Sequence, residues 1–166
     1  MLRDRFLLAI LGSIALLAVL AVGLFFLRQG QQVYAPEDTP QGILRNYVLA
    51  LEKKDFERAY GYLRAGEGKP DFQRFRQGFL TRQLDLTGAA LQIGEAQPSG
   101  DDVIISLVVI RSGGGPFAEV YREPNTATLV KDTAGVWKIA GMPFPYWGWD
   151  WYNPELIKPA PAVPGD

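Results

Sequence analysis

The residues with the clearest chemical meaning in this sequence lie near its C-terminal end, where three of the four tryptophans recur at every second position. They are Trp147, Trp149 and Trp151, flanked by Tyr146 and Tyr152. An extended chain presents alternate side chains on one side, so this spacing predicts a row of indole rings. Large aromatic rings dominate the energetics of protein interfaces, and the chemistry that this segment offers is therefore docking.

Three locations are open for these rings. They could fold back on the core of their own domain, lie at a membrane interface, where tryptophan and tyrosine are favoured, or dock in another subunit. A domain of this size has limited core to shelter so many large rings, which keeps the partner interpretation open. The sequence from Lys158 to Asp166 is typical of an extended proline-rich tail that becomes ordered when a partner holds it.

The composition excludes many kinds of catalytic and metal site. The chain has 166 residues and contains neither histidine nor cysteine, which removes histidine-dependent triads, thiolate nucleophiles and disulfides. The usual ligands of zinc, haem and iron–sulfur clusters are missing as well, so we expect no cofactor and no metal. With 17 basic and 18 acidic residues, no nucleic-acid partner is expected.

A basic patch is the one local exception to this balance of charge. Arg74, Arg76 and Arg82 lie close together around one predicted helix. An acidic partner or an anionic headgroup could bind such a face, but we interpret it as a solvated helix surface.

A long apolar segment lies at the N-terminus. From Phe6 to Leu27 the sequence has no charged residue, and a helix of this length would cross a bilayer. Arg3 and Arg5 precede the segment and only Arg28 follows it, so the positive-inside rule places the N-terminus in the cytoplasm. The sequence thus predicts a single-pass signal-anchor in the cytoplasmic membrane, with the rest of the chain on the periplasmic or extracellular side.

A cleaved signal peptide is the alternative interpretation of the same segment. The small residues of Ala21-Val22-Gly23 have the spacing of a cleavage site. We favour the uncleaved anchor because the apolar run continues to Leu27 and exceeds the usual length of a signal-peptide core.

Helical patterns come next along the chain. Thr39 followed by Pro40 is typical of a helix start, and apolar residues recur on one helical face to about Lys54. Asp55 can cap a second helix. A third begins at Pro70-Asp71 and carries Phe72, Phe75, Phe79 and Leu80 on one side.

Strand patterns follow after Gly88. The β-branched run 103–110 is the clearest strand, and further strands are predicted at 117–122, 126–131 and 136–139. Pro124 implies a bulge, an edge position or two separate strands. We therefore expect an α+β fold in which about three helices cover one face of a curved antiparallel sheet, behind a single N-terminal transmembrane helix.

The residues from Thr39 to Met142 resemble the nuclear-transport-factor-2-like superfamily, in particular its small bacterial membrane-anchored members. The resemblance rests on a helix followed by Lys54-Asp55-Phe56 and a second helix, and on the closing Gly135-Val136-Trp137-Lys138-Ile139. It implies a cone-shaped domain. These are core and turn residues, so the resemblance speaks to fold more than to function.

Enzymes of that superfamily hold a pocket between sheet and helices, with a carboxylate base and a phenol or acid as hydrogen-bond donor. The candidates that this resemblance suggests here are Tyr47, Tyr60, Tyr62, Asp85 and Glu119. An isomerase- or hydrolase-like enzyme would need one of these carboxylates buried. A second alternative is a module that binds a small apolar ligand or a lipid between sheet and helices.

The function that we expect is non-catalytic: an accessory or stabilising subunit of a larger membrane complex. Its partners would be integral membrane subunits and the bilayer, with a homodimer through the exposed sheet face as a further option. The docking residues would be Tyr146, Trp147, Trp149, Trp151 and Tyr152. The predicted organisation is a cytoplasmic end at 1–5, the membrane anchor at 6–27, a linker at 28–38, the domain at 39–142 and the aromatic tail at 143–166.

Overall fold

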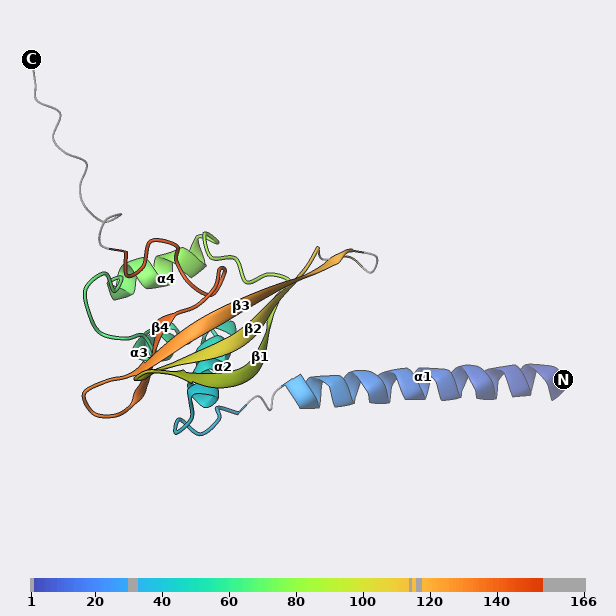
Figure 1. The fold of residues 1–166 in the computed structure, drawn as a ribbon. Coiled ribbons are helices and arrows are strands. Elements are labelled where there is room, and N and C mark those ends of the chain that lie inside the picture. The colour runs from blue at the N-terminus through green and yellow to red at the C-terminus, as the bar shows by residue number, and fades with distance from the viewer. Residues whose placement is uncertain (1, 30–32, 114, 116–117, 154–166) are drawn as a thin grey trace, which may run out of the picture. The chain divides into compact units, whose positions relative to one another are not determined.

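The computed structural model describes residues 2–29, 33–113, 115 and 118–153. The chain forms two units, Met1–Val33 and Tyr34–Asp166. The first contains helix α1 (Leu2–Gln29), and the second contains all the remaining elements (Figure 1). The predicted proline-rich tail and the predicted strand start at Phe117 lie outside the described residues.

The prediction of a transmembrane helix over 6–27 is contradicted. Among the helices that the structure describes, none combines the length and the apolar character that a membrane crossing requires. A crossing takes about 20 consecutive apolar residues. The side chains of α1 that the structure describes are those of residues 10–24. The anchor end residues Phe6 and Leu27 belong to α1, but their side chains are not among those described. The prediction of a single-pass signal-anchor is therefore wrong.

Three helices open the second unit, and side-chain caps begin each of them. They are α2 (Pro40–Glu52), α3 (Phe56–Gly61) and α4 (Phe72–Leu80). Thr39 accepts a hydrogen bond from the Gly42 amide at 3.1 Å, Asp55 one from the Arg58 amide at 3.2 Å, and Asp71 one from the Arg74 amide at 2.9 Å. These short-range bonds satisfy amides of the first turn, which is why the predicted helix starts are confirmed.

Four antiparallel strands follow in sequence order. They are β1 (Ala89–Ser99), β2 (Asp102–Ser112), β3 (Val120–Lys131) and β4 (Trp137–Gly141), and each pairs with the next. Alternate residues of β2 are buried, as a sheet with one covered face requires: Ile105, Leu107 and Val109.

Strand β3 runs unbroken through Pro124, so of the three expected arrangements the edge position is the one observed. Pro124 pairs with Val108 of β2. The last strand β4 pairs with β3 only from Thr128 onward. On that side none of the described strands pairs with Pro124, and a residue without an amide hydrogen is tolerated there.

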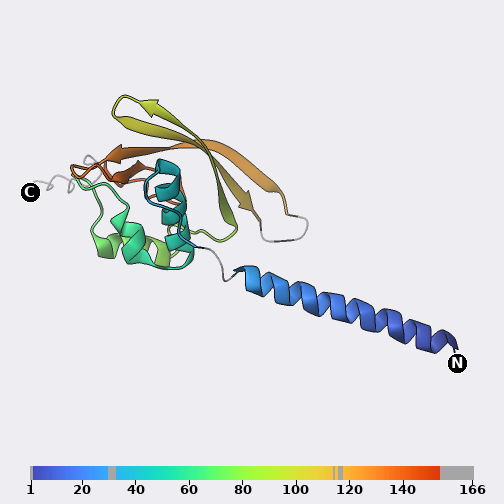
Figure 2. The same cartoon turned by 90° about the horizontal axis from the view of Figure 1, so that it is seen from below.

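The second unit has two layers. Figure 2 shows α2, α3 and α4, cyan to green, gathered on one face of the sheet. The core lies between the layers and is lined from both sides, by Ile43, Leu44 and Tyr47 of α2 and by Ile105, Leu129 and Ile139 of the sheet. The segment after β4, red in Figure 1, returns beside α4 and closes this core.

Candidate functional site

The aromatic segment 142–153 is built from tight turns and does not form an extended strand. The Tyr146 amide donates to the Pro143 carbonyl at 3.0 Å, and the Trp151 amide donates to the Gly148 carbonyl at 3.1 Å. Each turn reverses the chain within four residues, so alternate side chains no longer share a side. The predicted single row of indole rings is therefore not observed.

Two of the three tryptophans are buried in the domain. Trp147 and Trp151 are each 7% exposed and belong to the hydrophobic core. The Trp151 ring lies 5.3 Å from the Phe75 ring of α4 and 5.2 Å from the Trp147 ring, measured between centroids. Such contacts between large rings stabilise the return of the segment over the helices.

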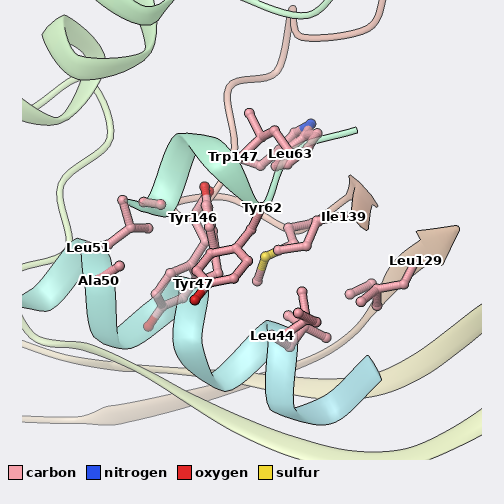
Figure 3. Packing of buried hydrophobic residues seen from close by; sticks show 14 of the residues in the cluster. Leu44, Tyr47, Ala50, Leu51, Tyr62, Leu63, Leu129, Ile139, Tyr146 and Trp147 are labelled. Carbon is pink, nitrogen blue, oxygen red and sulfur yellow. The ribbon is translucent and has the colours of Figure 1, made fainter. Parts of the chain in front are cut away.

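The two flanking tyrosines hold the segment to the helical layer. Tyr146 is buried, and Figure 3 shows it among core residues beside Tyr47. The Tyr152 ring stacks on Trp147 at 5.4 Å, its hydroxyl donates to the Arg64 carbonyl, and its amide donates to the Gly68 carbonyl at 2.8 Å. Burial raises the pKa of both phenols to about 12.

Trp149 is the exception in this segment, because its side chain is 77% exposed. It borders a surface hollow of about 520 Å³ beside α4. The floor of the hollow is buried and apolar and consists of Gly78, Leu84 and Trp151. We call this hollow and its borders the Trp149 surface; its lining residues are Arg74, Gly78, Gln83, Leu84, Phe144, Gly148, Trp149, Asp150 and Trp151.

Phe144 forms a second aromatic border of the Trp149 surface and is 47% exposed. Arg111 of β2 holds it in place: its guanidinium carbon lies 4.9 Å from the centre of the Phe144 ring, and its Nη2 donates to the Phe144 carbonyl at 3.3 Å. Among the described side chains, the Arg111 Nε is buried without a hydrogen-bond partner. The cation over the ring face restricts the loop that carries Phe144.

An ion pair forms the polar edge of the Trp149 surface. Arg74 of α4 donates to the Asp150 carboxylate. Arg74 is exposed, in agreement with its interpretation as solvated helix surface, and its guanidinium is also tied to the aromatic segment. Apolar centre and charged edge together resemble the composition of a protein-binding patch.

The five predicted docking residues thus lie in two different environments. Tyr146, Trp147 and Trp151 are buried, Tyr152 is half-buried, and Trp149 alone of the five points to solvent. Phe144 and Arg74 belong to the same surface and were not among the predicted docking residues. Proline on both sides of Phe144 was the available signal, because such residues favour an exposed turn.

The candidate catalytic residues are not brought together. The three phenols have separate partners: Tyr47 donates to the Tyr146 carbonyl at 2.6 Å, Tyr60 to the Pro70 carbonyl at 2.9 Å, and Tyr62 to Glu37 at 2.6 Å.

The two carboxylates among these candidates, Asp85 and Glu119, are exposed. Hydrogen bonds from Thr87 lower the pKa of Asp85, which is opposite to the shift of a general base in an apolar pocket. Glu119 accepts a hydrogen bond from Tyr121. In the described part of the chain, no group of three or more acidic side chains is placed to hold a metal ion.

Aromatic rings fill the space between α4 and the rest of the core. Phe75 is fully buried and packs edge-to-face against Phe79 at 5.2 Å and Tyr60 at 5.5 Å. Phe72 also contacts Tyr60 at 5.5 Å. These contacts pack α4 against α3.

A further hollow of about 510 Å³ opens at the surface between the end of α2 and the loop after α4, and Phe79 is one of its lining residues. Its walls include Leu51, Phe56 and Leu86, and its edge carries charges of both signs: Glu52, Lys54, Arg82 and Asp85.

Comparisons with known proteins give little support for function. No protein-family model matches the chain, and no curated protein matches it. One solved structure that is similar is RPA3114, a SEC-C motif-containing protein from Rhodopseudomonas palustris: identity is 14%, the alignment covers 64% of this chain and 79% of that one, and the TM-score is 0.44. Another is RV0760c from Mycobacterium tuberculosis, solved in complex with estradiol-17beta-hemisuccinate: identity is 16%, coverage 66% and 93%, and the TM-score 0.41. At these values neither carries an inference about this chain, and membership of the nuclear-transport-factor-2-like superfamily stays a prediction.

Proposed function

We propose that this chain is a non-catalytic accessory subunit whose domain binds another protein through the Trp149 surface. The observation that carries the proposal is the 77% exposure of the Trp149 side chain, between two tryptophans that are buried in the core. Exposing a large ring on an otherwise well-packed segment leaves apolar area in water, and a partner would remove that area from water.

The order of the segment around Trp149 supports this proposal. Trp147 and Trp151 are fixed in the core, and the amide of Tyr152 is bonded to Gly68. The loop is therefore already in one conformation before a partner arrives. Binding then loses less conformational entropy than it would with a flexible loop, and more of the contact energy appears as affinity.

The composition of the surface also supports a protein partner. Trp149 and Phe144 supply exposed aromatic area, while Arg74 and Asp150 supply charges at the edge. Tryptophan and arginine are the residue types that most often dominate binding energy at interfaces. The sequence predicts a partner among integral membrane proteins. The following experiment identifies this partner.

Photo-crosslinking at position 149 tests this function. The cells that make the protein would carry it with benzoylphenylalanine in place of Trp149, and the crosslinked product would be identified by mass spectrometry. We expect one major protein partner. With that partner purified, Trp149→Ala should weaken its binding about 30-fold, which corresponds to a hot spot of about 2 kcal/mol.

The matched control places the same crosslinker at Tyr121, an exposed aromatic residue on β3. A partner that crosslinks equally from both positions is non-specific and counts against the proposal. A crosslink from position 149 to a second copy of the chain would assign the surface to a homodimer and contradict the accessory-subunit function.

A further inference from the structure

Four residues close to the start of α2 lie against α2 and α3. They are Tyr34, Ala35, Pro36 and Glu37, and we call them the strap. They fall in the predicted linker 28–38, but each contacts the helical layer. Their contacts are of the kinds that recognise an extended peptide: backbone hydrogen bonds, and side chains held by groups of complementary charge.

Asn46 of α2 forms two hydrogen bonds with the backbone of the strap. Its side-chain Nδ2 donates to the Ala35 carbonyl at 2.8 Å, and its Oδ1 accepts from the Ala35 amide at 2.7 Å. Asn46 has no exposed surface and is the one polar residue among the fully buried side chains that the structure describes. A buried amide must find partners for its donor and its acceptor, and here the backbone N–H and C=O of Ala35 supply both.

Gly42 gives the strap its close approach to α2. A Cβ at this position would overlap the Pro36 carbonyl oxygen. A side chain at position 42 would therefore displace the Pro36 carbonyl, and glycine leaves room for it.

Positive charges hold the aromatic end of the strap. The Arg58 guanidinium carbon lies 3.5 Å from the centre of the Tyr34 ring, and the Lys53 ammonium lies 5.0 Å from it. The Tyr34 hydroxyl points to Asp55 at the longer distance of 3.4 Å. Cations on the ring face are selective for an aromatic side chain at this position.

A carboxylate is held at the other end of the strap. Glu37 accepts a hydrogen bond from Arg58 Nη2 at 2.8 Å and one from the Tyr62 hydroxyl at 2.6 Å. Arg58 also donates through Nε to Tyr62 at 2.8 Å, which fixes both donors. The residues around the strap therefore fit an aromatic residue and, three positions later, an acid.

We propose that α2 and α3 form a peptide-binding site that the strap of this chain occupies, and that takes an extended peptide of the Tyr-Ala-Pro-Glu type when the strap leaves. Pro36 and Glu37 are exposed. Local opening of such a segment costs less than global unfolding. A free peptide must compete with an intramolecular ligand, whose effective concentration is in the millimolar range for a short tether. The site is thus inhibited by its own strap.

The test uses a fluorescein-labelled peptide with the sequence of residues 33–38 and the full chain. The variant Tyr34→Ala with Glu37→Ala weakens the strap by removing the two side chains that Arg58 contacts, and it changes no residue of α2 or α3. We expect this variant to bind the peptide at least tenfold more tightly than the wild-type chain does. Adding Arg58→Ala, or using a peptide that carries Glu37→Ala, should lower the affinity at least tenfold again. Arg45→Ala, an exposed arginine of α2, is the control and should have no effect.

A second measurement needs no variant. Excess peptide added to the wild-type chain should displace the strap and speed the hydrogen exchange of the Ala35 amide, which Asn46 otherwise protects. An Ala35 exchange rate that millimolar peptide leaves unchanged overturns the proposal. So does a strap-weakened variant with a native circular dichroism spectrum that fails to bind the peptide, or that binds it equally with and without Arg58.

Discussion

The hydroxyl of Tyr47 donates a hydrogen bond to the backbone carbonyl of Tyr146 at 2.6 Å, although the two residues lie 99 positions apart in the chain. Both are buried, Tyr47 in the middle of α2 and Tyr146 in the aromatic segment (Figure 3). The bond satisfies a carbonyl that water does not reach. It ties the end of the domain to its first helix, so the segment that carries Trp149 is part of the fold itself.

Removing this hydroxyl should destabilise the domain. Tyr47→Phe leaves the buried Tyr146 carbonyl without its donor, and we expect the free energy of unfolding to fall by about 1–3 kcal/mol. Urea denaturation measures the change. Tyr60→Phe, which removes a hydrogen bond to Pro70 from a half-buried ring, is the control and should cost less. Equal stability of Tyr47→Phe and the wild type would contradict the role of the bond.

The two neighbouring tryptophans should respond differently to truncation. Trp151→Ala removes a ring that packs against Phe75 and Trp147, and should lower the free energy of unfolding by about 3–5 kcal/mol. Trp149→Ala removes an exposed ring and should change it by about 0.5 kcal/mol or less. Thermal unfolding of the two single variants makes the comparison. Similar losses in both would mean that Trp149 is packed in solution.

Gly148 should tolerate no side chain. A Cβ there would overlap the Trp151 indole, including its Nε1, so Gly148→Ala must shift a buried ring. We expect a loss of about 1–3 kcal/mol in the free energy of unfolding. The control is Gly61→Ala in α3, where a Cβ meets no atom within 4 Å. A smaller loss of stability in Gly148→Ala than in Gly61→Ala would contradict this prediction.

Alkaline pH should unfold the aromatic segment. Burial raises the pKa of Tyr146 and Tyr152 from 10.0 to about 12, so the fold favours the neutral phenols. Their contribution to stability is fully present below pH 10 and is lost as the pH rises through about 12. Phenolate absorbance during a pH titration measures this, and Tyr146→Phe should remove one of the late-ionising groups. Complete ionisation near pH 10 with the fold intact would be inconsistent with their burial.

Acid should release the strap. Hydrogen bonds from Tyr62 and Arg58, with a smaller contribution from Lys138, hold the pKa of Glu37 below its ordinary value of 4.5. Its contribution is therefore present above pH 4.5 and is lost as the pH falls through the lowered pKa. The chemical shift of the Ala35 amide reports the release. Glu37→Gln should abolish this transition, and a transition of the same midpoint in that variant would assign it to another group.

The helix starts and the sheet were accessible to sequence analysis because their causes are local. Thr39, Asp55 and Asp71 bond to amides three residues further on, and the β-branched residues of 103–110 favour a strand by their type. The course of β3 through Pro124 was left open. It depends on where β4 ends, which is a property of the pairing and not of the proline.

The strap and the orientation of the tryptophans were not accessible in the same way. Composition alone placed Tyr34 and Glu37 in a linker, since a short polar segment after an apolar run has no helical or strand period. Their partners Arg58 and Tyr62 lie more than 20 positions away, and no local signal indicates contacts at that separation.

The amino-acid sequence by itself determined where the helices of the domain begin, that residues 103–110 form a strand, and that histidine and cysteine chemistry is absent. Each of these depends on residue type or on contacts within one element. Only the tertiary structure decided that Trp147 and Trp151 are core residues while Trp149 is exposed. That choice depends on the turn at Gly148 and on rings from α4, and packing against distant residues overrides the alternation that the spacing of the three indoles suggests.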